Sequence, residues 1–331
     1  MISAKELKYK INKRLFLAAL LVFLLLAVFQ RWTEGFANGY INEGNSKLAG
    51  SDYNGALRDY YYADKLDDGR EISYLSKIRR GEIFFKFGKL DEAEKEFTQA
   101  IIEEKRRYEA YGLLGSLYYK KKDLDRAISF YNNAIQYNDG PKTKLDLGIK
   151  RSKVFMAKGE MDIAGNILRS LYSEIPEGKG NEELLYNVGL LEFDRNISPN
   201  SYLDEIRSSD EYGWKVREID NFIGKYNSKY NNGFSDIMAA SLYNSLQEPY
   251  LAINRAQKAV TSDESYRDAW IMLGKSHFMT EDYASSLDDL ARALKLDGHN
   301  GETFFWLGSV FRKIGNERMA SEYFGKYEAF K

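Results

Sequence analysis

Side chains that carry most enzyme chemistry are scarce in this sequence of 331 residues. His277 and His299 are the two histidines, and there is no cysteine. No nucleophile with a neighbouring base, carboxylate pair, phosphate-binding glycine loop or metal-ligand spacing stands out from the rest of the pattern. The lack of cysteine also excludes disulfides, thiolate metal sites and an acylated lipoprotein cysteine. The sequence therefore predicts no enzyme, no cofactor and no metal site.

The charge balance argues against a nucleic-acid partner. Lys and Arg number 48 against 49 Asp and Glu, so the formal net charge is -1. Such a balance gives no basic field that would recruit a phosphate backbone. With four prolines and 15% aromatic residues, the chain can form many helices and bury rings between them.

The N-terminal segment has the composition of a membrane-directing sequence. Residues 1–14 are basic, and they precede the apolar run LFLAALLVFLLLAVF at 15–29, which Arg31 and Trp32 follow. We interpret residues 15–32 as a transmembrane signal-anchor that leaves residues 1–14 in the cytoplasm. Fifteen helical residues reach only about 22 Å of a hydrocarbon core of about 30 Å, so a signal peptide cleaved near Ala27 and a buried soluble helix are the alternatives.

Glycines inside helical patterns are followed twelve residues later by small residues. A helical glycine costs about 1 kcal/mol relative to alanine, so each needs a local reason. Each small residue also has a large side chain nine residues before it and another four residues after it. The pairs are Gly81 and Ala93, Gly115 and Ala127, Gly274 and Ser286, and Gly308 and Ala320.

The spacing between these units is 34 residues. Positions 93 and 127 are 34 apart, as are 252, 286 and 320. Two helical stripes in a 34-residue period indicate a helical solenoid. Weaker copies surround Ala56, Ala164 and Ala252, although Ser152 stands where the Ala164 unit needs its glycine.

These offsets resemble the tetratricopeptide repeat family over nearly everything from residue 37 to 331. The expected fold is therefore all-α: a right-handed helical-repeat solenoid preceded by a single N-terminal transmembrane helix. Two antiparallel helices approach closely where both present a residue without bulk, so we expect Gly115 to face the helix of Ala127 and Gly308 the helix of Ala320. The predicted repeat-packing residues are Gly44, Gly81, Gly115, Gly189, Gly274, Gly308, Ala56, Ala93, Ala127, Ala164, Ala252 and Ala320.

One interruption divides the repeats. After Gly189 the expected second helix does not follow on schedule, and Pro199 with neighbouring Asn and Ser residues favours turns. Residues 195–211 are interpreted as an insertion, either a hinge or partner-specific loop or merely an eroded repeat. The predicted divisions are a front array at 37–178, a degenerate repeat at 179–232 and a rear array at 233–331.

The family resemblance implies a concave surface lined by the first helix of each pair. The clustered lysine and asparagine with which some relatives grip a terminal carboxylate are absent, so a protein or peptide segment with apolar anchors is the expected partner. The predicted partner-binding residues are Leu75, Ile78, Phe85, Tyr119, Ile149, Met156, Phe234, Ile237, Ile271, Phe278, Phe305 and Arg312. Several of these rings are alternatively buried where the repeats curve.

The sequence thus predicts a membrane-anchored scaffold whose C-terminal domain is extracytoplasmic and binds other proteins. The alternatives are a secreted or periplasmic form after signal cleavage, and an accessory subunit of an envelope enzyme or assembly machine.

Protease added to spheroplasts tests this topology. Because the basic residues precede the apolar run, we expect digestion of the C-terminal domain while the inner membrane is intact. Digestion only after that membrane is broken would place the domain in the cytoplasm and contradict the assignment.

Overall fold

Helices make up most of the chain in the computed structural model, which describes residues 4–66, 69–138, 140–175, 180–196, 201–226 and 233–330. These residues contain no strand. The helices are α1 (Ala4–Ala49), α2 (Tyr53–Leu66), α3 (Arg70–Lys86), α4 (Leu90–Glu103), α5 (Tyr108–Lys120), α6 (Leu124–Gln136), α7 (Pro141–Ala157), α8 (Met161–Glu174), α9 (Glu182–Asn196), α10 (Ser201–Glu205), α11 (Gly213–Tyr226), α12 (Gly233–Ser245), α13 (Pro249–Ser262), α14 (Arg267–Met279), α15 (Tyr283–Leu296), α16 (Gly301–Lys313) and α17 (Glu317–Ala329).

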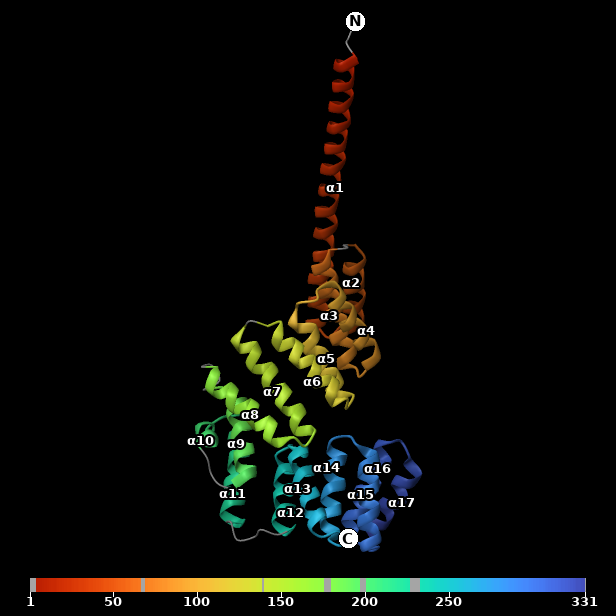
Figure 1. Cartoon of the computed structure of the whole chain (residues 1–331). Coiled ribbons are helices and arrows are strands. Elements are labelled where there is room, and N and C mark those ends of the chain that lie inside the picture. The colour runs from red at the N-terminus through yellow and green to blue at the C-terminus, as the bar shows by residue number, and fades with distance from the viewer. Residues whose placement is uncertain are drawn as a thin grey trace. The chain divides into compact units, whose positions relative to one another are not determined.

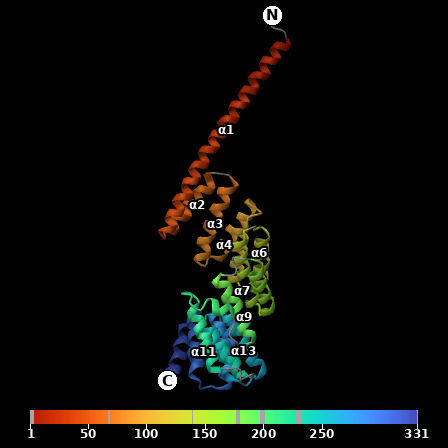
Figure 2. The same ribbon diagram turned by 90° about the vertical axis from the view of Figure 1, so that its left-hand side faces the viewer.

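The helices pack as consecutive hairpins within two compact units. The first unit is Met1–Leu147 and the second is Gly148–Lys331, a division that falls inside the predicted front array. In the first unit α1 packs on α2, α3 on α4 and α5 on α6; in the second, α12 packs on α13, α14 on α15 and α16 on α17. Figures 1 and 2 show these neighbouring hairpins.

A large side chain of the second helix covers the glycine of the first. A methyl group placed on Gly274 would lie 2.7 Å from Leu290 Cγ, and one on Gly115 would lie 2.8 Å from the Tyr131 ring. In every such pair the covering residue follows its glycine by sixteen positions. The pairs are Gly44 and Tyr60, Gly81 and Phe97, Gly115 and Tyr131, Gly274 and Leu290, and Gly308 and Phe324.

The structure identifies which side chain of the partner helix lies nearest to each glycine. The atoms closest to a methyl group on Gly81, Gly115 or Gly308 belong to a ring of the second helix. A flat ring over a bare backbone fills the space between two helices better than two small groups would. Gly274 lies against a large residue, Leu290, and also against a small one, Ser286. The Ser286 hydroxyl donates a hydrogen bond of 2.7 Å to the carbonyl oxygen of Gly274.

The small residues themselves lie in the core. Their side chains occupy positions where a larger group would hold the two helices apart. Relative exposure is 0% for Ala56, Ala93, Ala127, Ala164 and Ala252, and 2% for Ala320.

The repeat around Ala164 uses a different glycine. Ser152 is fully buried and donates to the carbonyl of Ile149 at 2.7 Å. The close contact moves one turn earlier, where a methyl group on Gly148 would lie 2.6 Å from Leu171. Gly189 is buried in α9.

Each turn between paired helices contains one residue with positive φ, five positions before the small residue. Glycine occupies this place three times, as Gly88, Gly159 and Gly315. The other four are Ser51, Lys122, Gln247 and Glu281, with φ between 59° and 64°. This left-handed conformation ends the first helix and lets the chain reverse.

The predicted insertion contains the short helix α10, and α11 follows it. Residues 197–200 lie outside the described part of the chain. Helix α9 packs against α10, and Phe193 of α9 contacts Phe222 of α11 and Tyr243 of α12 at centroid distances of 6.0 and 6.3 Å. Aromatic contacts thus join the interruption to the array that follows.

Helix α1 runs without a break from the apolar segment into the first repeat. It has 46 residues, and its segment Ala18–Ala49 is long and apolar enough to cross a membrane by length and composition. Leu20 to Phe29 are exposed, whereas Ala37 and Gly44 are buried against α2. The sequence predicts a boundary between residues 32 and 37, but the helix continues through it, and residues 33–36 contain no proline to end it.

Gly274→Ala and Gly325→Ala are expected to shift the melting temperature in opposite directions. The methyl group at 274 would collide with Leu290, and overpacking a core costs about 1–3 kcal/mol. The methyl group at 325 would meet nothing within 4 Å, so alanine there gains helix propensity of about 1 kcal/mol. Thermal unfolding followed by circular dichroism measures both; a stabilising alanine at 274 would contradict the packing.

Candidate protein-binding surface

The predicted partner-binding residues fall into two groups in the structure. Five are buried within the chain, at 2–6% exposure, and cannot reach a partner while the repeats stay folded: Ile78, Ile149, Met156, Ile237 and Ile271. They pack between helices, which agrees with the alternative prediction that some of these side chains are buried where the repeats curve. Side chains that reach the surface are Leu75, Phe85, Tyr119, Phe234, Phe278, Phe305 and Arg312.

Three half-buried rings meet on the first helices of the last two pairs. The Trp306 centroid lies 5.4 Å from that of Phe278 on α14 and 5.2 Å from that of Phe305 on α16. Phe305 is further held by Phe324 and Tyr327 of α17, at 6.1 and 5.4 Å. We call Phe278, Phe305 and Trp306 the aromatic strip.

Two cations accompany the aromatic strip. Lys275 Nζ lies 5.5 Å from the Trp306 centroid, and the Arg312 guanidinium lies 5.0 Å from the Phe324 centroid. Cation–π contact keeps such side chains close to the rings. The strip therefore presents apolar surface beside positive charge.

Trp306 was absent from the predicted set. It lies one residue after the position that the repeat offsets assign to the surface, yet it joins Phe278 to Phe305. The indole N–H of Trp306 is a hydrogen-bond donor, which suits a partner's carbonyl oxygen. The tryptophan itself, next to a phenylalanine in a first helix, was the available signal.

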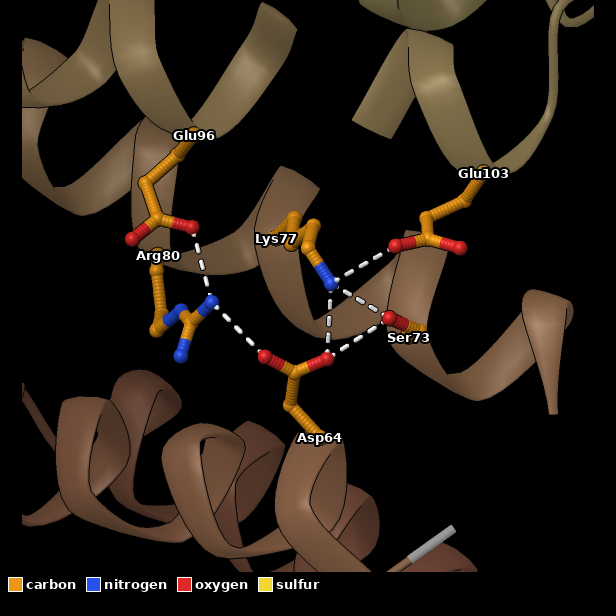
Figure 3. Close-up of polar contacts among 6 residues, drawn as sticks. All are labelled: Asp64, Ser73, Lys77, Arg80, Glu96 and Glu103. Atoms are coloured by element: carbon orange, nitrogen blue, oxygen red, sulfur yellow. Dashed lines mark hydrogen bonds and ion pairs between the residues drawn. The ribbon is translucent and has the colours of Figure 1, made fainter. Parts of the chain in front are cut away.

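A cluster of charged side chains lies at the junction of α2, α3 and α4 (Figure 3). Asp64 accepts from Ser73 and Lys77 at 2.7 and 2.8 Å and from Arg80 at 3.1 Å. Arg80 also pairs with Glu96 at 2.8 Å, and Lys77 with Glu103 at 3.3 Å.

The partners of Asp64 in this cluster determine its charge. Burial alone would raise the pKa of Asp64, but hydrogen bonds from Lys77 and Ser73 and both nearby cations bring it below its ordinary value. The carboxylate is thus fixed in its charged form and saturated by partners from α3. It joins the first helix pair to the second.

The two histidines contact different neighbours in the second unit. Nδ1 of His277 lies 2.6 Å from Asp289 Oδ2, with both side chains largely buried, and His299 packs on Phe330. Burial raises the pKa of Asp289, and the bond to His277 partly offsets this. Among the residues that the structure describes, no group of three His, Asp or Glu side chains is arranged to hold a metal ion.

A polar surface pocket of about 630 Å³ in the second unit is lined by several charged side chains that pair with one another. Arg255 donates to Asp194 at 2.7 Å and to Asp236 at 2.9 Å, and Tyr243 donates to Asp194 at 2.9 Å. Arg195 pairs with Asp162 at 2.7 Å. These ions serve the packing of α9, α12 and α13.

Comparison with known proteins identifies the repeat. Residues 78–141 match the family described as tetratricopeptide repeat. The chain contains tetratricopeptide repeats. The matched segment includes α4, α5 and α6, with the Gly81–Phe97 and Gly115–Tyr131 contacts.

Two relatives and two solved structures illustrate the similarity. A TPR repeat-containing protein of Methanocaldococcus jannaschii is 28% identical over 149 residues, 44% of this chain and 24% of the relative. A BBSome complex member BBS4 homolog of Drosophila melanogaster is 25% identical over 231 residues, 68% of this chain and 41% of the relative. The chain thus spans less than half the length of either relative.

The solved structures are a tetratricopeptide repeat protein from Parabacteroides merdae and YrrB, a TPR protein with an unusual peptide-binding site. The first is 18% identical, covers 78% of this chain and 93% of its own, and has a TM-score of 0.34. The second is 17% identical, covers 71% and 92%, and has a TM-score of 0.29.

Asp64→Asn is expected to destabilise the protein by about 3 kcal/mol, because it leaves Lys77 and Arg80 buried without their shared counter-charge. The pKa of Asp64 is lowered on folding, so its contribution is present above the unfolded-state pKa and is lost as the pH falls through the folded-state value. The variant should therefore lose less stability on acidification than the wild type.

Urea unfolding in non-ionic detergent, at neutral pH and in acid, measures both effects. Glu92→Gln is the matched control, because Glu92 is exposed and has no ion pair among the described residues. Equal stability of Asp64→Asn and Glu92→Gln would contradict the role of the cluster.

Proposed function

We propose that this chain is a membrane-anchored scaffold that binds other proteins through the aromatic strip. The observation that carries the proposal is the strip itself: three large rings, half-buried and held by their neighbours, at the surface of first helices. Pre-packed rings lose little conformational freedom when a partner covers them.

The chemistry of the strip favours a partner segment with apolar or aromatic anchors and nearby acidic groups. The rings supply area for the anchors, the indole N–H of Trp306 suits a backbone carbonyl, and Lys275 and Arg312 suit carboxylates. Tyrosine, tryptophan and arginine are the residue types that dominate binding energy at protein interfaces. The predicted partners are accordingly proteins or peptide segments and not nucleic acid or metal ions.

The exposed apolar part of α1 supports retention in a membrane. Phe23, Leu25, Leu26 and Val28 are 60–68% exposed, and no other part of the described chain covers the most apolar window. Burying them in lipid would stabilise the chain by about 25 cal/mol per Å². Arg14 and Arg31 flank the run, and the basic residues before it favour an extracytoplasmic C-terminal domain.

We further infer that the chain is not itself an enzyme. Both histidines and the buried carboxylates are engaged in packing or ion pairs, as in the pair of His277 with Asp289 and the cluster around Asp64. An accessory subunit of an envelope enzyme or assembly machine remains consistent with this function, since such a subunit needs a binding surface and no reactive group.

The double variant Phe278→Asp, Phe305→Asp tests the strip. Replacing two rings of the strip by carboxylates removes the apolar contact area. It should abolish the enrichment of partners that co-purify with the wild-type protein from crosslinked native membranes. Ile271 is unsuitable as a target because it is 3% exposed, and aspartate there would unfold the repeat.

The matched control is Phe87→Asp, Ile314→Asp, at side chains that are 56% and 47% exposed and lie outside the strip. Thermal melts establish whether both variants stay folded. If the aspartate variant of the strip does not fold, the double variant Phe278→Ala, Phe305→Ala takes its place. An unchanged set of partners from a folded strip variant would refute the proposal.

A further inference from the structure

Five large exposed side chains gather where α1 leaves the first repeat. Trp32 and Phe36 lie one turn apart on α1, and Tyr61, Tyr62 and Leu66 lie on the last turns of α2; their exposures run from 40% to 62%. On α1 the Trp32 and Phe36 rings contact each other, with centroids 4.7 Å apart, and on α2 the Tyr61 and Tyr62 rings do so at 6.0 Å. We call these five residues the collar.

Helix α1 fixes the distance between the collar and the apolar run. Because the helix is continuous, Trp32 lies about 4.5 Å and Phe36 about 10 Å beyond Phe29 along its axis. The C-terminal end of α2 lies beside residues 37–40 of α1, since Ala63 packs against Ala37 and the Tyr62 and Tyr40 centroids are 5.6 Å apart. Figures 1 and 2 show α2 beside only the C-terminal part of α1.

The apolar run is too short to keep the collar away from a bilayer. Residues 15–29 span about 22 Å of a hydrocarbon core of about 30 Å, which leaves a deficit of about 8 Å. A short span is accommodated by thinning the bilayer and by drawing flanking residues inward. If the difference of about 8 Å is divided equally between the two ends of the apolar run, residues 32–37 lie in the headgroup layer. This layer is about 5–8 Å deep on each side of the bilayer.

The residue types of the collar suit that layer. Tryptophan and tyrosine concentrate at membrane interfaces because one end of the ring is apolar and the other forms hydrogen bonds. Lys65, whose Nζ lies 5.7 Å from the Tyr61 centroid, and Arg31 are exposed beside these rings, where they can reach lipid phosphates.

We propose that the collar rests in the headgroup layer of the membrane that holds α1, an inference that depends on the anchoring proposed above. The end of the first helix pair is then seated on the lipid surface. The occupant of this exposed patch is the bilayer, and no separate protein is needed to cover it.

Single cysteines can test the collar, because the natural chain has none. The full chain is reconstituted in phosphatidylcholine–phosphatidylglycerol vesicles and labelled with an environment-sensitive fluorophore at Leu66→Cys, at Lys65→Cys or at Phe36→Cys. Quencher lipids with the spin label in the headgroup, or deep in the acyl chain, then report the depth. We expect headgroup quenchers to reduce the fluorescence at all three positions.

Phe87→Cys is the matched control, because Phe87 is 56% exposed and contacts Tyr53 at the opposite end of α2. It should keep its intensity with either quencher. Val22→Cys reports the anchor itself and should be quenched by the acyl-chain label.

The outcomes separate the two proposals. Suppose that Val22→Cys is quenched but that headgroup quenchers do not affect Leu66→Cys and Lys65→Cys. This result would support the anchor and overturn the proposed seating of the collar in the headgroup layer. The same result is expected if a protein or a second copy of the chain covers the collar. Absence of quenching at Val22→Cys would overturn both.

Discussion

One close contact organises this chain: the backbone of a glycine in the first helix of a pair lies against a large side chain of the second. Gly44, Gly81, Gly115, Gly274 and Gly308 each meet the residue sixteen positions later. The missing side chain costs helix propensity, but it lets the helices approach and bury a ring or leucine that neither could bury alone. The contact recurs after 34 residues from Gly81 to Gly115 and from Gly274 to Gly308, and successive hairpins form an array because each pair exposes an apolar side that the next one covers.

The sequence could predict the contact's position but not its partner. Spacing identifies which residues share a helix face, and this was enough for the all-helical fold, the repeats and the apolar N-terminal helix. Which side chain covers Gly115 depends on how far Tyr131 reaches across the interface, and periodicity contains no such distance. The same limitation applies to Ile149 and Ile271, which offsets assigned to the surface and which the structure buries.

Charges were harder still to interpret from sequence. Asp64, Lys77 and Arg80 occur among many charged residues of a mixed helical surface, and nothing in their spacing distinguishes buried ions from solvated ones. Their network forms because three helices converge there, so desolvation is compensated by several hydrogen bonds at once. The aromatic strip escaped full prediction similarly, since Trp306 joins rings from two different repeats. The proposed scaffold function rests on this apolar strip, whose rings are held by their neighbours.

Nuclear magnetic resonance of the glycine α-protons tests the central contact most directly. A ring stacked on a glycine shifts its α-protons upfield through the ring current. The account predicts such shifts at Gly44, Gly81, Gly115 and Gly308, which face rings, and ordinary helical shifts at Gly274, which faces Leu290, and at Gly325, which faces open space. Ordinary helical shifts at all six glycines would contradict the packing on which this architecture rests.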